Sequence, residues 1–254
     1  MSESEQLLDL ALRVGKKAAE LLMARPDVLE VSTKSSDVDI VTQMDKASEA
    51  MIVSSILAER PHDGMIGEEG ADRESTSGIT WVIDPLDGTV NYFYGLPGWN
   101  VSIAAKDKDG VVVGVVVSPT LNSTWWATRG GGSFHNGKKL TCNDPVELNR
   151  AMLATGFAYE SEKRGLQLQF INTLLPQIRD IRRNGAAAVD LCFVGAGNVD
   201  AYFESGLHEW DLAAGGLIAQ EAGAVMEEHQ IGGQNFTLAA GPHLLQILRN
   251  TLGL

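Results

Sequence analysis

Cysteine, long hydrophobic runs and positive charge are all scarce in this chain of 254 residues. Its two cysteines, Cys142 and Cys192, are too few for a disulfide framework and lack the spacing of metal ligands. The longest apolar run, residues 111–117, is far too short to cross a bilayer. The first residues are acidic where a secretion signal would be basic and then apolar. We therefore expect a cytoplasmic protein with reduced thiols and no membrane partner.

The shortage of positive charge limits the ligands that the protein can attract. Acidic residues outnumber basic ones by 33 to 20, which gives a formal net charge of −13. This field would on average repel a polyanion, so no direct contact with nucleic acid is expected. It would also repel an anionic small substrate, unless a cation that the sequence does not supply sits in the binding site.

The chain has no internal repeat, low-complexity tract or linker. Apolar residues at helical spacing predict a helix from Leu7 to Leu21, and a second helix is predicted between its N-cap, Thr42, and Arg60-Pro61. Short apolar segments between polar turns predict strands at residues 79–84, 101–105, 111–117 and 123–128. Later strands at residues 151–155 and 201–204 alternate with helices at residues 165–175, 187–196 and 210–221. This order is typical of a layered α+β or α/β protein with helices on more than one sheet.

The most informative segment, residues 81–89, reads Trp-Val-Ile-Asp-Pro-Leu-Asp-Gly-Thr. An apolar strand brings Asp84 to its carboxyl end, and Asp87-Gly88-Thr89 then opens a short helix. At such a strand-to-helix turn a carboxylate can bind a cation, while the backbone N–H groups of Gly88 and Thr89 face an anion. An Asp-Gly turn with a helix-capping threonine is the alternative interpretation.

Two further segments carry acidic residues in unusual surroundings. Gly67-Glu68-Glu69-Gly70 places adjacent carboxylates between glycines, a pattern that by itself is typical of a solvated turn. Residues 210–216 begin a helix with Asp211, where an aspartate usually caps the helix or meets its dipole. The small residues that follow Asp211 would let this helix approach another backbone closely.

Together, in this order and at these separations, the three segments resemble the inositol monophosphatase family of Mg²⁺-dependent, lithium-sensitive phosphatases, bacterial type. The resemblance extends from about Leu7 to Gly223 and is weaker beyond, where relatives continue with a longer strand-and-turn segment. It implies a layered αβαβα sandwich of the type shared with fructose-1,6-bisphosphatase. It also implies a single unit over residues 1–254, divided softly into a metal- and phosphate-binding half, residues 1–145, and a substrate half, residues 146–254. Relatives are usually homodimers, so a homodimer is expected.

The resemblance implies two or three bound Mg²⁺ ions. In the family, residues matching Glu68, Asp84 and the main-chain carbonyl of Leu86 bind the first ion. Asp84 also contacts the second ion together with Asp87 and Asp211, and a third ion is attributed to the Glu68 side. Two carboxylates about 4 Å apart repel by about 4 kcal/mol at an effective dielectric constant of about 20, so these acids would not share a pocket ionised without cations. Ligation by oxygen alone suits Mg²⁺ or Mn²⁺ and not zinc.

The implied reaction is direct attack of a metal-bound water on phosphorus, with Asp45, Glu68 and Thr89 as catalytic residues. In the family, the threonine matching Thr89 hydrogen-bonds this water and is backed by the aspartate matching Asp45. The amides of Gly88 and Thr89 would hold the phosphate. Without the resemblance, Asp45 is equally well explained as the capping carboxylate of the second helix. Lithium is expected to inhibit by taking the place of the second ion.

For the alcohol part of the substrate, the resemblance implies contacts with Asp87, Asp211, Glu204 and the main chain of Ala187. A carboxylate that accepts hydrogen bonds from vicinal hydroxyls is reasonable chemistry for a polyol. Glu204 is otherwise explained as a solvent-facing acid at the end of a strand. Many relatives carry serine or threonine where this chain has Ala186, so a hydroxyl contact is absent there.

Three more residues are candidates with plain alternatives. Lys34 matches a family lysine on the loop before the second helix and is otherwise an exposed loop lysine. Glu69 adjoins the candidate ligand Glu68. Arg182 belongs to a cluster of arginines that faces the substrate, a subunit interface or only solvent. His208 and Cys192 are expected to be structural.

The function that the resemblance implies is hydrolysis of a polyol phosphate monoester, with inositol 1-phosphate as the substrate. Fructose 1,6-bisphosphate, histidinol phosphate and 3′-phosphoadenosine 5′-phosphate are alternatives, because the same site chemistry serves relatives that act on them. A protein-binding role is an alternative of another class, since some bacterial relatives associate with the transcription machinery.

Overall fold

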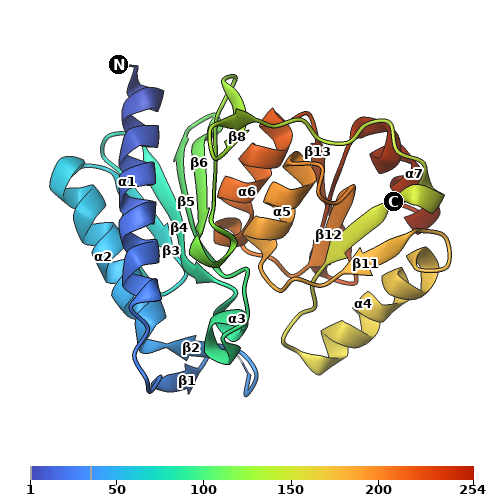
Figure 1. Ribbon diagram of the computed structural model, residues 1–254, viewed down its shortest axis with the longest axis horizontal. Helices are drawn as coiled ribbons and strands as arrows, with labels where there is room; N and C mark the ends of the chain where they lie inside the picture. The colour runs from blue at the N-terminus through green and yellow to red at the C-terminus, as the bar shows by residue number, and fades with distance from the viewer. Residues whose placement is uncertain (1, 35) are drawn as a thin grey trace.

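The computed structural model describes residues 2–34 and 36–254, which form five layers (Figure 1). Helices α1 and α2 cover the outer face of a seven-stranded sheet, and α5 and α6 lie between this sheet and a five-stranded one. Helices α4 and α7 cover the far face of the second sheet. The αβαβα sandwich predicted from the sequence is therefore confirmed.

The helices are α1 (Glu3–Met23), α2 (Gln43–Glu59), α3 (Thr89–Tyr94), α4 (Ser161–Leu174), α5 (Ala187–Gly195), α6 (Glu209–Glu221) and α7 (Pro242–Leu252). The first strands are β1 (Val31–Thr33), β2 (Ile40–Thr42), β3 (Gly64–Gly67), β4 (Thr80–Asp87), β5 (Asn100–Asp107), β6 (Gly110–Ser118) and β7 (Ser123–Thr128). The remaining strands are β8 (Gly132–His135), β9 (Lys138–Lys139), β10 (Met152–Thr155), β11 (Asp180–Arg182), β12 (Ala201–Ser205), β13 (Val225–Ile231) and β14 (Gln234–Ala240).

Strand order explains why the acidic segments converge. The first sheet has the order β3-β4-β5-β6-β7-β8-β9, and only its β3–β4 pair is parallel. Because β3 and β4 run side by side in the same direction, Glu68, which follows β3, emerges at the same edge as Asp84 of β4. The second sheet has the order β11-β10-β12-β14-β13, with β11, β10 and β12 parallel.

The two N-terminal helices follow from local sequence as predicted. Thr42 caps α2, and the N–H and hydroxyl groups of Thr42 both donate to the carboxylate of Asp45. The helix ends at Glu59, ahead of Arg60-Pro61, since a residue before proline avoids the helical conformation. The apolar stripe of α1 is buried against the first sheet.

Small residues let α6 approach its neighbours closely, as expected from the sequence. A Cβ atom on Gly114 of β6 would lie 2.7 Å from the carbonyl oxygen of Ala214 in α6. A Cβ atom on Gly215 would lie 2.8 Å from the carbonyl oxygen of Ala188 in α5. These contacts bring the N-terminus of α6, with Asp211, next to the first sheet.

The C-terminal segment, where the resemblance is weaker, still forms regular secondary structure. After Gly223 the chain forms β13, β14 and the amphipathic helix α7. Strand β13 lies at the edge of the sheet. Its sequence shows little alternation of apolar and polar residues, because most of its side chains are polar and partly exposed. Such an edge strand lacks the apolar pattern that identifies buried strands, which is why it was missed. None of the helices in residues 2–34 and 36–254 combines the length and apolarity that a membrane crossing requires.

Candidate active site

A cavity of about 410 Å³ lies where the end of β4 meets the N-terminal ends of α3, α5 and α6. Two loops close its other side. Residues 156–160 follow β10, and residues 205–208 begin at the last residue of β12. Ten of the residues expected from the sequence line it: Lys34, Glu68, Asp84, Leu86, Asp87, Gly88, Thr89, Ala187, Glu204 and Asp211. Asp45 and Glu69 do not line the cavity but bond to residues that do, and Arg182 lies outside it.

The turn from β4 to α3 holds two of the carboxylates in fixed orientations. The N–H group of Leu86 donates to Asp84 Oδ1 over 3.0 Å. An irregularity in the pairing of β4 with β5 separates Asp84 from Asp87. Asn100 Nδ2 then donates to Asp87 Oδ2 over 2.8 Å.

Position 88, the N-cap of α3, requires glycine because of its backbone conformation and its close neighbours. Its φ angle of 84° lies in the left-handed region that side chains disfavour. A Cβ atom here would also lie 3.2 Å from the carbonyl oxygen of Gly185. Glycine thus leaves the first amides of α3 open to the cavity, where they can donate to an anion.

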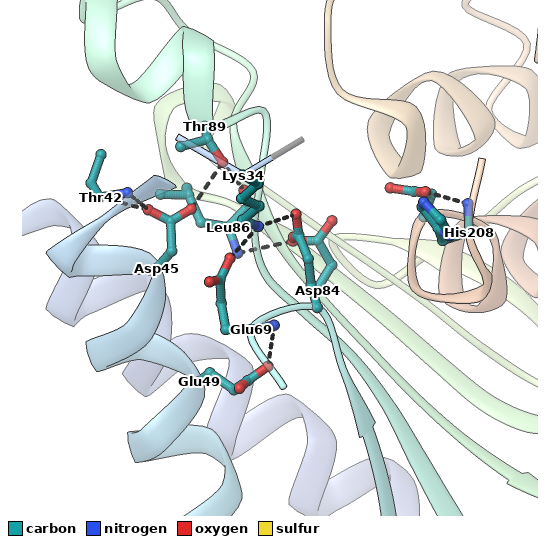
Figure 2. A network of polar contacts seen from close by, with 11 residues as sticks. Lys34, Thr42, Asp45, Glu49, Glu69, Asp84, Leu86, Thr89 and His208 are labelled. Carbon is teal, nitrogen blue, oxygen red and sulfur yellow. Dashed lines mark hydrogen bonds and ion pairs between the residues drawn. The ribbon is translucent and has the colours of Figure 1, made fainter. Parts of the chain in front are cut away.

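Asp45 combines the two roles that the sequence left open. Its Oδ2 caps α2 by accepting from Thr42, while its Oδ1 lies 2.9 Å from the hydroxyl of Thr89 (Figure 2). The Thr89 hydroxyl also lies 3.1 Å from the carbonyl oxygen of Leu86. Since a hydroxyl has one proton, Thr89 can donate to one of these oxygens at a time and keeps lone pairs free to accept.

Lys34 is an exposed loop lysine, as one of the two interpretations had it, but its ammonium group is paired with the acidic turn. Its Nζ lies 2.7 Å from Glu68 Oε1 and also bonds to Glu69. The backbone N–H group of Glu69 donates to Glu49 Oε2 over 2.9 Å, which ties this acidic turn to α2 (Figure 2). Burial lowers the pKa of Lys34, but the carboxylates of Glu68 and Glu69 outweigh it and raise the pKa above its usual value.

The pKa values of three acids in this cavity are raised. Burial raises the pKa of Asp84 well above its usual value, and the carboxylates of Glu68, Asp87 and Asp211 raise it further. Burial also raises the pKa of Asp211 well above its usual value and that of Asp87 to about 6. These shifts mean that the ionised carboxylates lack sufficient positive charge around them.

The donor chemistry of this cluster fits a hard divalent cation. Burial and the neighbouring carboxylate of Glu68 both raise the pKa of Asp84, so a proton or a bound cation has to offset the repulsion between these two acids. Every candidate ligand is a carboxylate or carbonyl oxygen, the set that Mg²⁺ or Mn²⁺ prefers. Within residues 2–34 and 36–254, no group of three or more His, Cys, Asp or Glu side chains is arranged so that it could hold a metal ion. In this arrangement the ammonium group of Lys34 supplies the positive charge at Glu68.

The opposite wall carries the residues expected at the alcohol part of a substrate. Asp211 Oδ2 accepts from the N–H group of His208 over 2.6 Å at the start of α6 (Figure 2). The His208 ring stacks on Trp210. Glu204 Oε2 accepts from the hydroxyl of Tyr202 over 2.6 Å. Burial raises the pKa of Glu204 to about 7. Glu204 is therefore not a fully solvated strand-end acid but a partly buried group in the cavity wall.

The loop before α5 is anchored from two sides. Ala188 N–H donates to Asp87 Oδ2 over 2.9 Å, which links α5 to the β4 turn. Asn91 of α3 donates to the carbonyl oxygen of Asn184 over 2.8 Å, and Asn184 donates to Asp190 Oδ1 over 2.5 Å. This chain of bonds fixes the backbone around Ala187 against the helix that carries Thr89.

The structure separates two neighbouring arginines. Arg182 pairs with Asp180 at the surface and does not reach the cavity, whereas Arg183 lines it. The sequence predicted a functional role for this arginine cluster as one alternative, but it did not indicate which arginine would reach the cavity. Phe157 and Tyr159, which follow the parallel strand β10, were also missed. Their position after a parallel strand was the available signal, because ligands bind at the carboxyl ends of such strands.

Comparison with known proteins decides the family. Residues 3–246 match the model of the inositol monophosphatase family. The chain belongs to this family. Nus factor SuhB of Escherichia coli K12 is 40% identical over 237 residues, which cover 91% of this chain and 88% of that protein.

Solved structures of the inositol monophosphatase family share the whole fold. The IMPase of Thermotoga maritima superposes with a TM-score of 0.87 at 29% identity and covers 98% of both chains. SuhB of Mycobacterium tuberculosis superposes with a TM-score of 0.85 at 35% identity, over 100% of this chain and 98% of that one. The relatives thus carry two kinds of name, IMPase and Nus factor SuhB. Family membership supports phosphatase activity without fixing the substrate.

Proposed function

We propose that this chain is a metal-dependent phosphatase that hydrolyses polyol phosphate monoesters, with inositol 1-phosphate as the substrate. The observation that carries the proposal is that Glu68, Asp84, Asp87 and Asp211, far apart in sequence, line one cavity beside the N-terminus of α3. This combination provides sites for cations and for a phosphate group together.

The residues that would hold the metal are Glu68, Asp84, Asp87, Asp211 and the carbonyl of Leu86. Two or three Mg²⁺ ions, or Mn²⁺ in their place, would neutralise the phosphate and supply an activated water when bound. The raised pKa values of Asp84 and Asp211 support this assignment, because a divalent cation would offset the repulsion among the ionised carboxylates.

On the phosphate side, residues of the chain would position the phosphate group and hydrogen-bond the attacking water. The amides of Gly88 and Thr89 would donate to phosphate oxygens at the start of α3. The Thr89 hydroxyl would accept from the attacking water while it donates to Asp45 Oδ1. Because the capping bonds from Thr42 hold Asp45, this pair is oriented before substrate enters.

On the alcohol side, Glu204 and Asp211 would accept hydrogen bonds from hydroxyl groups next to the ester. The main chain around Ala187 would border the ring, held in place by its bond network to Asp87 and Asn91. Three carboxylates at this wall, counting Asp87, favour a neutral polyol over an alcohol with its own negative charge near them.

The test is a panel of phosphate esters with Mg²⁺, measured as phosphate release. Inositol 1-phosphate is expected to give the highest kcat/KM, ahead of histidinol phosphate and other monoesters, and lithium is expected to inhibit. Fastest turnover of fructose 1,6-bisphosphate or 3′-phosphoadenosine 5′-phosphate would reassign the substrate. Absence of turnover for every ester at millimolar concentration would overturn the enzymatic proposal.

Three further properties belong to the same proposal. We infer a cytoplasmic homodimer, which sedimentation of the purified chain would test. The division into residues 1–145 and 146–254 stays a prediction, although every strand of the first sheet precedes residue 140 and every strand of the second follows residue 151. Limited proteolysis near residue 145 would test that division.

A second candidate function is association with the transcription machinery, favoured by the Nus factor SuhB name of the relatives. The net charge of −13 disfavours direct RNA contact, so the partner would be a protein. A pull-down with wild type and Asp84→Asn separates the two functions. Retention of one transcription protein by both forms would support the second role, and loss of every partner on purification would remove it.

A further inference from the structure

Glu204, in the wall of the cavity, is held in one position by neighbours from two strands. It lies in β12, where Tyr202 stands two residues earlier and therefore on the same face of the strand. The hydroxyl of Tyr202 donates to Glu204 Oε2 over 2.6 Å. Within residues 2–34 and 36–254 this hydroxyl is the only hydrogen-bond donor to Glu204, so Oε1 stays available to a ligand.

The hydroxyl of Tyr202 is a permanent donor. The Tyr202 side chain is fully buried, and burial raises the pKa of its hydroxyl well above the usual value, so the group keeps its proton. A buried tyrosine hydroxyl needs a hydrogen-bond partner, and its bond to an ionised carboxylate is stronger than a bond between neutral groups. Burial raises the pKa of Glu204, whereas the bond from Tyr202 acts in the opposite direction by favouring the ionised form. Tyr202 therefore keeps Glu204 oriented as an acceptor.

Gly156 leaves the space that the carboxylate of Glu204 occupies. It follows β10, whose last residue, Thr155, pairs with Phe203 of the parallel strand β12. A Cβ atom on Gly156 would collide with both carboxylate oxygens of Glu204. The φ angle of Gly156 is not positive, so its backbone conformation does not require glycine. The carboxylate, and not the backbone, is what requires glycine at this position.

The geometry points to Tyr202 and Gly156 as positioning residues that determine specificity, because together they hold Glu204 where it accepts a hydrogen bond from a hydroxyl group of the alcohol. This inference rests on the proposed function, since it assumes that the alcohol part of the ester lies at this wall. The substrate class that it favours is a monoester whose alcohol carries a free hydroxyl group near the ester. A site built to bind a hydroxyl discriminates against an analogue that lacks it, because the buried acceptor is then left without a partner.

Inositol 1-phosphate and cyclohexyl phosphate form a matched pair of substrates, because their rings have the same size and only the first carries free hydroxyl groups. We expect wild type to have a KM at least about tenfold lower for inositol 1-phosphate. Tyr202→Phe should raise this KM about five- to tenfold, keep kcat within about twofold and leave both constants for cyclohexyl phosphate unchanged. Tyr92→Phe is the control, since it removes another buried hydroxyl, which donates to the carbonyl oxygen of Leu22, and it should keep the preference.

Gly156→Ala tests the same position by a different route. Its methyl group should displace the carboxylate of Glu204 and raise KM for inositol 1-phosphate at least as much as Tyr202→Phe does, again without an effect on cyclohexyl phosphate. Because the colliding atoms are the far end of a flexible side chain, Tm should stay close to that of wild type. Gly165→Ala in α4 is the control, since a Cβ atom there meets nothing within 4 Å, and it should leave KM unchanged.

Other outcomes overturn the inference. An equal rise in KM for both esters, or a loss confined to kcat, would show that these residues support the cavity as a whole. An unchanged KM for inositol 1-phosphate in either variant would also refute their role in positioning Glu204.

Failure of the proposed function is a separate result, namely that wild type releases phosphate from neither ester. Calorimetric titration of inositol 1-phosphate with Mg²⁺ into wild type and Tyr202→Phe then tests the inference by binding alone. About tenfold weaker binding by the variant supports it, and equal binding, or no binding by either protein, refutes it.

Discussion

Replacement of Asp84 by asparagine should make the metal-free protein more stable and the enzyme inactive. Asparagine has nearly the same shape, and its Oδ1 can still accept the N–H group of Leu86, now at 3.0 Å from the carboxylate. What the substitution removes is one acid from a buried group that includes Glu68, Asp87 and Asp211. The local structure is kept while the electrostatic cost is reduced.

The gain in stability can be bounded in two ways. Repulsion between two carboxylates about 4 Å apart is about 4 kcal/mol at an effective dielectric constant of about 20. The gain cannot exceed about 5 kcal/mol, the cost of keeping an aspartate with a pKa of about 3.9 protonated at pH 7.5. Allowing for relaxation, we expect about 2–4 kcal/mol. Because a chain of this size has an unfolding entropy near 0.5 kcal/mol per kelvin, Tm should rise by about 4–8 °C.

The assay is thermal unfolding in a chelator and in excess Mg²⁺. Wild type should gain much more from Mg²⁺ than Asp84→Asn does, because binding to the folded state alone stabilises it. Asp190→Asn is the control, since Asp190 is a buried acid of raised pKa outside the proposed metal ligands. It should raise Tm equally in both buffers. Phosphate release by Asp84→Asn should fall at least about a hundredfold. A lower Tm in chelator, or a Mg²⁺ response equal to that of wild type, would refute the metal assignment.

Substitutions at three positions test the roles of single residues. Thr89→Ala should lower kcat about a hundredfold, because it removes the hydroxyl bonded to Asp45, whereas Thr89→Ser should stay within about tenfold of wild type; equal losses in phosphate release would refute a role for the hydroxyl. Gly114→Val should destabilise by about 1–3 kcal/mol, because its Cβ would lie 2.7 Å from the carbonyl oxygen of Ala214, and an unchanged Tm would contradict this packing. Burial raises the pKa of Asp190, so the folded state holds its proton up to a higher pH than the unfolded state and stability falls as pH rises through that interval. Asp190→Asn should therefore stabilise most at pH 8 and least near pH 4, and a pH-independent difference in Tm would show that Asp190 is not the cause.

Local sequence signals were sufficient for the elements that carry the acids. The apolar run before Asp84 predicted β4, and the cap and proline signals predicted α2 almost to the residue. Residues close together in the sequence determine these elements, so a single sequence is enough to predict them. The edge strand β13 was missed, because its stability comes from pairing with β14 and not from its own apolar pattern.

The two roles of Asp45 show what a sequence cannot separate. A capping carboxylate and a catalytic one have the same spacing from Thr42. The structure shows that one oxygen caps the helix while the other meets Thr89, which comes from a different element. Only the packing of α2 against β4 brings the second partner within reach, so no local pattern could have distinguished the roles.

The acidic cavity and a neighbouring hollow, lined in part by Phe93, Tyr94 and Arg183, differ in how well the sequence predicts their lining residues. The acidic cavity takes its carboxylates from short, dense segments, so its motif survives in the sequence. The neighbouring hollow takes three residues from the segment between β1 and α2, three from α3, two from the loop after β10, and one each from α4 and the loop before α5. None of these segments has a recognisable local pattern. A substitution of Arg183 leaves every acidic segment intact. The lining of this hollow can therefore change without any change in the motifs by which the family is recognised.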